Sequence, residues 1–207
     1  MIARLLAFTA CISLVFLPSA ARAYSVAVVG EELLIGTDPG QANRIIVEVV
    51  GNSILVSDTA GLDPGHGCKD DGKHVSCKAN NVVLVSIQTG DMDDTVRVVG
   101  IEAFIDVGDG DDRVTAASQA TIFGRAGNDR LISKDGNDLI RGGSGNDVIR
   151  DYGGRDLLKG GAGDDFVDSQ DGERDRLFGG TGEDGYGTTC DDRDRAHQFE
   201  SGVEGCA

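Results

Sequence analysis

A short polar–apolar pattern recurs along the C-terminal half of the chain. From about Thr89 to Gly187, an aspartate is followed two residues later by an apolar side chain, mostly at intervals of nine residues. The apolar positions are Val96, Val114, Leu131, Ile140, Ile149, Leu158, Val167, Leu177 and Tyr186, and Ile105 and Ile122 keep the same phase where the aspartate is lost. The pattern predicts eleven short strands, each with its middle residue pointing inward.

The residues between these strands are rich in glycine. Of the 31 glycines, 21 lie between Gly90 and Gly187, a region without proline. Glycine reaches positive φ without a steric penalty, so six such residues can form a tight turn. Strands this short cannot bury a core alone, but strands of adjacent coils can pair and stack their inward residues. We therefore expect an all-β solenoid over residues 89–187.

Two copies of the repeat are nearly complete, namely GGSGNDVIR at Gly142–Arg150 and GGAGDDFVD at Gly160–Asp168. They resemble the nonapeptide G-G-x-G-x-D-x-U-x of the RTX (repeats-in-toxin, haemolysin-type) calcium-binding family. The resemblance implies a parallel β-roll in which two nonapeptides make one coil, so that turns alternate between two edges. It also implies Ca²⁺ ions between successive turns of an edge, held by the aspartates and turn carbonyls of both turns.

The two edges differ in their acidic residues. On what we name the first edge, all six turns end in aspartate: Asp94, Asp112, Asp129, Asp147, Asp165 and Asp184. On the second edge, Ala103 takes the aspartate position of one turn and the turn before Ile122 has no acid, so that Asp138, Asp156 and Asp175 remain. We therefore predict up to five calcium sites on the first edge, and one or two near the C-terminal end of the second.

The predicted ligands are these nine aspartates and the turn glycines. The glycines are Gly108, Gly110, Gly124, Gly127, Gly142, Gly145, Gly160, Gly163, Gly179 and Gly182. Ca²⁺ prefers six to eight oxygen ligands from carboxylates, carbonyls and water. Carboxylates stacked at the spacing of adjacent strands repel one another, so we expect roughly five to seven Ca²⁺ ions to be needed for the roll to fold.

The flanks predict a targeting segment and two caps. Residues 1–23 have a basic start, an apolar run and a small-x-small end, which is typical of a cleaved signal peptide. Residues 24–88 are expected to form a β-rich N-terminal cap, with strands at 44–50 and 53–57 joined by a Gly51-Asn52 hairpin and another strand at 81–87. Residues 40–45 faintly resemble a repeat, with Asn43 in the aspartate place. Residues 188–207 are expected to form a C-terminal cap, in which Asp191, Asp192 and Asp194 are a solvated face.

Four cysteines remain after removal of the signal: Cys68, Cys77, Cys190 and Cys206. An even number in an exported chain favours disulfides, and we favour pairing between neighbours, although pairing between the two ends of the chain stays open. A zinc site of Cys68 and Cys77 with His66 and His74 is the alternative for the first pair.

Charge and motifs exclude several functions. Removal of residues 1–23 takes two arginines from a chain of net charge −16 and leaves −18, which disfavours nucleic acid and anionic membranes as partners. There is no H-E-x-x-H or G-x-S-x-G motif, and no long apolar segment for membrane insertion. We expect a secreted calcium-binding protein without catalytic activity, in the extracellular space or at the periplasm or cell surface. The alternatives are a polysaccharide lyase or epimerase on a β-solenoid, and a calcium-rigidified adhesion module with a surface or glycan partner.

Overall fold

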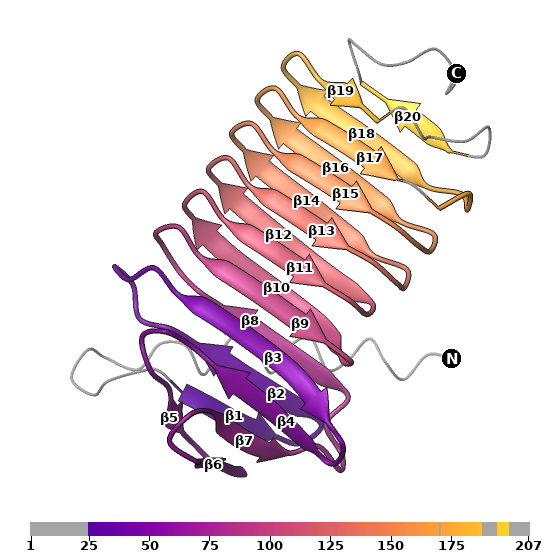
Figure 1. The fold of residues 1–207 in the computed structure, drawn as a ribbon. Coiled ribbons are helices and arrows are strands. Elements are labelled where there is room, and N and C mark those ends of the chain that lie inside the picture. Colours follow the sequence, from indigo (N-terminus) through magenta and orange to yellow (C-terminus); the bar gives the residue numbers. More distant parts are fainter. Residues whose placement is uncertain (1–24, 170, 188–193, 199–207) are drawn as a thin grey trace.

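The computed structural model describes residues 25–169, 171–187 and 194–198, which form two ten-stranded sheets (Figure 1). The described part contains no helix, and therefore no helix able to cross a membrane. The first sheet has the order β20-β18-β16-β14-β12-β10-β8-β2-β1-β5 and the second the order β19-β17-β15-β13-β11-β9-β3-β4-β7-β6. The predicted signal peptide and the pair Cys190 and Cys206 lie outside the described residues.

The bounds of the strands follow the two sheets. The first sheet consists of β1 (Ser25–Val29), β2 (Glu32–Gly36), β5 (Asp63–Pro64), β8 (Leu84–Gln88), β10 (Glu102–Asp109), β12 (Ala120–Ala126), β14 (Leu139–Ser144), β16 (Leu157–Ala162), β18 (Arg176–Thr181) and β20 (Arg195–His197). The second consists of β3 (Arg44–Val50), β4 (Ser53–Ser57), β6 (Cys68–Asp70), β7 (Val75–Lys78), β9 (Thr95–Val99), β11 (Arg113–Ala116), β13 (Arg130–Ser133), β15 (Val148–Asp151), β17 (Phe166–Ser169) and β19 (Gly185–Tyr186).

Within the repeat region the chain alternates between the sheets, and each strand pairs in parallel with strands of the coils before and after it. The register places Ile122 beside Ile140, and Ile140 beside Leu158. These side chains, like the other predicted inward residues from Val96 to Leu177, are at most 1% exposed. The expected all-β parallel roll is confirmed, and its early strands bury further apolar side chains beside the predicted ones, among them Val98 and Val107.

Tyr186 departs from this pattern, because its side chain is only partly buried. It lies in β19, the outermost strand of its sheet, which pairs with β17 alone. An inward residue needs a covered coil on both sides to lose all contact with water, and the order of the sheet gives Tyr186 a neighbour on one side only.

The turns of the first edge approach each other so closely that they exclude side chains. Gly127 has φ 133° and Gly145 has φ 116°, values that L-residues rarely adopt. A Cβ on Gly127 would collide with the carbonyl oxygen of Gly110, and a Cβ on Gly145 with that of Gly127. Glycine at this position is therefore required by backbone conformation and by the contact between coils.

A Gly127→Ala substitution is expected to lower the free energy of unfolding by roughly 3 kcal/mol or more, because it adds backbone strain and a clash with backbone. Gly51→Ala is the matched control, since Gly51 has φ 60° with nothing within 4 Å of its Cβ position, and should cost only about 1–2 kcal/mol. Denaturant unfolding of the two variants measures the difference. Equal costs would contradict the close approach of the coils.

The stacking begins before the first predicted repeat. The Gly51-Asn52 hairpin forms as predicted, with β3 and β4 antiparallel, and β3 also pairs in parallel with β9. On the other sheet, β2 and β8 pair in parallel with each other, and β8 pairs with β10. The buried side chains of these strands and those of the roll form one continuous hydrophobic cluster. The N-terminal strands thus extend the roll as well as cover its end.

A disulfide joins Cys68 and Cys77, which face each other on the antiparallel strands β6 and β7. Pairing between neighbours is confirmed for these two cysteines. Because both thiols are consumed by the disulfide, the alternative of a zinc site with His66 and His74 does not form. The bond fastens β6, the outermost strand of its sheet, to the rest of the N-terminal region.

The parallel pairing also continues past Gly187. Strand β20 pairs with β18 in the phase of the repeat, with Ala196 beside Leu177. Asp194 therefore occupies the aspartate place of a further turn on the second edge, whereas the sequence placed it on a solvated face.

Candidate metal centre

The first edge carries a continuous row of buried carboxylates. Each of its six aspartates closes a turn directly before a strand of the second sheet, and each is at most 3% exposed. From Asp112 to Asp184, the Oδ1 atom of each accepts a hydrogen bond of 2.7–2.9 Å from the backbone N–H of the aspartate one coil earlier. The predicted aspartate row is thus linked coil to coil through one oxygen of each side chain.

Asn43 begins this row. Its backbone N–H donates to Oδ1 of Asp94 at 2.6 Å, and the following residue, Arg44, lies beside Thr95 in the strand register. The faint resemblance of residues 40–45 to a repeat therefore corresponds to a real turn. The side-chain Oδ1 of Asn43 is buried, carries no charge and forms no hydrogen bond among the described residues.

The other carboxylate oxygen has no such partner. Among the described residues, no hydrogen bond reaches the buried Oδ2 atoms of Asp94, Asp112, Asp129, Asp147 and Asp165. A buried carboxylate oxygen without a partner is costly, because burial removes its water and nothing replaces it. A bound cation would supply the missing interaction.

Glycine at the first turn position makes room for these oxygens. A Cβ on Gly124 would collide with Oδ2 of Asp129, and a Cβ on Gly142 with Oδ2 of Asp147. The carbonyl oxygen of Gly142, from the next coil, also lies against the Cβ position of Gly124. A carboxylate oxygen of one coil and a carbonyl oxygen of the next therefore converge at the same place.

One of the predicted glycines is out of phase. In the strand register Gly108 pairs with Arg125, so Val107 and not Gly108 stands beside Gly124. Val107 is fully buried there. The turn before Asp112 thus has an apolar side chain where the later turns of the first edge have glycine, which the spacing in sequence did not show.

Turn carbonyls at the fourth position add further oxygens. The carbonyl oxygens of Gly110, Gly127 and Gly145 each occupy the place that a Cβ would take on the equivalent glycine one coil later. Within the described residues, none of these three carbonyl oxygens accepts a hydrogen bond from the backbone. The predicted ligands Gly127, Gly145, Gly163 and Gly182 stand in this row, and Gly124, Gly142, Gly160 and Gly179 in the row over the carboxylates.

Burial makes the charged forms of these aspartates costly. It raises the pKa of Asp112 and of Asp147 to about 7, and that of Asp129 and of Asp165 to about 6. The neighbouring carboxylates of the row raise the pKa of Asp147 further. At neutral pH the row therefore needs either protons or cations to neutralise it.

The second edge is built in the same way over a shorter span. The N–H groups of Ala120, Asp138, Asp156 and Asp175 donate at 2.6–3.0 Å to Oδ1 of Asp138, Asp156, Asp175 and Asp194. Burial raises the pKa of Asp138 to about 7 and that of Asp175 to about 6. The expected asymmetry of the two edges is present. The sequence feature that could have placed Asp194 in the repeat is its distance of 19 residues from Asp175, with the apolar Ala196 two residues later.

All candidate ligands on both edges are oxygens of carboxylates and backbone carbonyls. Such a donor set suits hard cations, Ca²⁺ above all, because Ca²⁺ accepts many oxygens in flexible geometry. Zinc and other borderline metals prefer nitrogen and sulfur ligands. The oxygens left without hydrogen bonds between successive turns therefore fit calcium.

Comparison with known protein families gives one match. The family model of the RTX calcium-binding nonapeptide repeat matches residues 121–149 and 141–173, with four copies in the matched regions. Comparisons with curated proteins and with solved structures gave no significant match.

Proposed function

Because residues 121–173 are RTX calcium-binding nonapeptide repeats folded as a β-solenoid, we propose that this is an exported calcium-binding protein whose roll folds around Ca²⁺ ions held between successive turns. The repeats imply a structural role in calcium binding. The observation that carries the proposal is the row of buried Oδ2 atoms without hydrogen bonds on the first edge.

The proposed ligands are the aspartates and turn glycines predicted from the sequence, except Gly108, which is out of phase with the later turns. In each inter-turn space of the first edge, the carboxylates closing two successive turns and the carbonyl oxygens of their glycines would share one ion. Six turns provide up to five such spaces, and the second edge would add one or two. We therefore propose five to seven Ca²⁺ ions.

The role proposed is binding and not catalysis. The aspartates of both rows from Asp94 to Asp184 are at most 3% exposed, so a substrate could not reach them. These side chains accept hydrogen bonds from the backbone of neighbouring turns of the chain. Export is supported by the predicted signal peptide and by the disulfide Cys68–Cys77, because disulfides persist mainly in oxidising compartments.

Calcium binding by an Asp147→Asn variant tests the proposal. Asparagine retains the oxygen that accepts the N–H of Asp129, but it removes the charge shared by the two ions on either side of this turn. We expect calorimetric titration to show a calcium affinity at least about tenfold lower, or about 1.4 kcal/mol, for part of the sites.

Asp135→Asn is the matched control, because it removes the same charge from an exposed turn residue. Its isotherm should equal that of the wild type. Absence of calcium binding by the wild type, or equal isotherms for both variants, would contradict the proposed function.

A further inference from the structure

The second edge differs from the first at the opening position of its turns. On the first edge this position is glycine in the four later turns, which leaves room for a carboxylate oxygen. On the second edge it is Ser133, Asp151 and Ser169 in successive coils. Asp151 is fully buried, so that turn has an acid at its first residue and another, Asp156, at its last.

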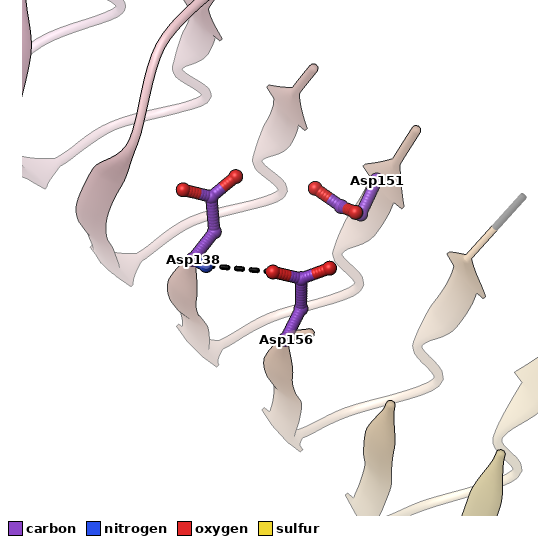
Figure 2. Close-up of side chains that lie close together, drawn as sticks. All are labelled: Asp138, Asp151 and Asp156. Carbon is purple, nitrogen blue, oxygen red and sulfur yellow. Dashed lines mark hydrogen bonds between the residues drawn. The ribbon is translucent and has the colours of Figure 1, made fainter. Parts of the chain in front are cut away.

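Asp151 brings a third carboxylate to the space between two turns. Carboxylate oxygens of Asp138, Asp151 and Asp156 all lie within 4.8 Å of one another. Figure 2 shows Asp138 and Asp156 on neighbouring turns, linked by the hydrogen bond from the N–H of Asp138, with Asp151 beside them. Within the described residues, only two groups of three acidic side chains lie this close together, and both belong to the second edge.

Two oxygens of this group form no hydrogen bond within the described part of the chain. Oδ1 of Asp138 accepts the N–H of Ala120, and Oδ1 of Asp156 accepts the N–H of Asp138. The Oδ2 atoms of both are buried, and no described residue forms a hydrogen bond with them. These two side chains are 3% exposed, so water cannot replace the missing partners.

Asp151 is held in place by its neighbours. The hydroxyl of Ser133, one coil earlier, donates to its Oδ1, and the N–H of Gly153 donates to its Oδ2 at 3.1 Å. No arginine or lysine in the described part of the chain comes within ion-pair distance of Asp138, Asp151 or Asp156. Three buried carboxylates thus face one another without a direct ion pair, although Arg155, Arg174, Arg176 and Arg195 line the same hollow as Asp138 and Asp156.

The second group of three, Asp156, Asp171 and Asp175, is less suited to a cation. Asp171 accepts the N–H groups of Gly154 and Glu173 with its two oxygens, and Oδ2 of Asp175 accepts the hydroxyl of Ser169. Only Asp156 has an oxygen left over, and that oxygen already belongs to the first group.

We propose that the second-edge site between the turns of Asp138 and Asp156 is a three-carboxylate site for a hard cation, in which Asp151 supplies a carboxylate that the nonapeptide does not contain. The inference rests on the proposed function in taking the ion to be Ca²⁺. A third carboxylate increases the negative charge around the ion, and charge count is one of the factors that sets calcium affinity. The site therefore binds Ca²⁺ more tightly than the inter-turn spaces of the first edge, and binds trivalent lanthanides more tightly still.

Asp151→Ser tests this site, because serine is the residue that the chain itself has at this position one coil earlier and one coil later. Titration of the wild type with Tb³⁺, followed by competition with Ca²⁺, should resolve one class of site at the lowest ion concentrations. In Asp151→Ser this class should weaken tenfold or more, while the remaining sites and the calcium-loaded circular dichroism spectrum stay unchanged. Asp135→Asn is the charge-matched control on the same edge and should retain the tight class.

Asp151→Asn is the second variant, for the case that Asp151→Ser does not fold in calcium. It retains oxygen and amide groups able to hydrogen-bond at this position and removes only the charge, and it should show the same selective loss. If the wild type binds calcium and both variants keep the tight class, the site at Asp151 is refuted while the proposed function stands. If the wild type binds no calcium, the proposed function itself fails.

Discussion

Removal of calcium by a chelator at neutral or higher pH is expected to abolish most of the β-structure of the roll. Two carboxylates about 5 Å apart repel by roughly 3 kcal/mol at an effective dielectric of about 20. The first edge stacks six in a row, and one oxygen of each accepts a hydrogen bond from the backbone of the coil before it. A whole domain is stable by only about 5–15 kcal/mol, so a few such pairs suffice to unfold it.

Far-UV circular dichroism and limited proteolysis measure this loss. The chelated protein should lose most of its β-sheet signal and be cut within residues 89–187, and added Ca²⁺ should restore both. Mg²⁺ should restore far less, because it demands octahedral geometry and gives up its water reluctantly. The N-terminal strands, closed by the disulfide Cys68–Cys77, should keep part of the signal. A chelated protein as compact and as resistant as the loaded one would refute the structural role of calcium.

The calcium-free protein is expected to regain stability when it is acidified. Burial raises the pKa of Asp112 and Asp147 to about 7 from an ordinary value of 3.8. Because the folded state binds these protons more tightly than the unfolded state, protonation favours folding. The stabilisation that these bound protons give to the folded state is complete below the unfolded pKa near 4, and it is lost as the pH rises through 6 to 7. The pKa of Asp156 is raised to about 9, so its stabilising proton is lost at the highest pH.

With calcium present the dependence on pH should reverse. Protons compete with Ca²⁺ for the same carboxylates, so the calcium concentration at half-folding should rise as the pH falls. Urea unfolding in chelator at about pH 5 and about pH 8, repeated with excess calcium, tests both signs. An Asp112→Asn and Asp147→Asn double variant should show a weaker dependence in chelator. Parallel curves with and without calcium would contradict the prediction.

Local sequence was sufficient for the architecture of the roll. The spacing of aspartate and apolar residues predicted which side chains point inward, and Val96 to Leu177 are buried as expected. It also sorted the aspartates correctly between two edges, since a coil of about 18 residues returns each turn to the same edge. This works because every coil repeats the same packing, with a side-chain period of two and a tight turn that glycine favours.

The first and last coils of the roll were harder to predict, because strand pairing decides where the roll begins and ends, and the composition of the repeat does not. Asn43 and Asp194 occupy the aspartate place of turns that lack most of the glycine pattern. Strand partners there are supplied by the neighbouring coil, which imposes the register on a sequence that specifies it only weakly. Tyr186 shows the converse, since a correct repeat position stays partly exposed where the sheet ends.

The sequence by itself therefore determined the solenoid, its two edges and the identity of most candidate acidic ligands. Only the tertiary structure decided which oxygen of each carboxylate is used by the backbone, which is left for a cation, and that Asp151 joins Asp138 and Asp156. The physical reason is that these relations join atoms of different coils. They depend on how coils are stacked and on the directions that side chains take in the turns, and neither is encoded within a single nonapeptide.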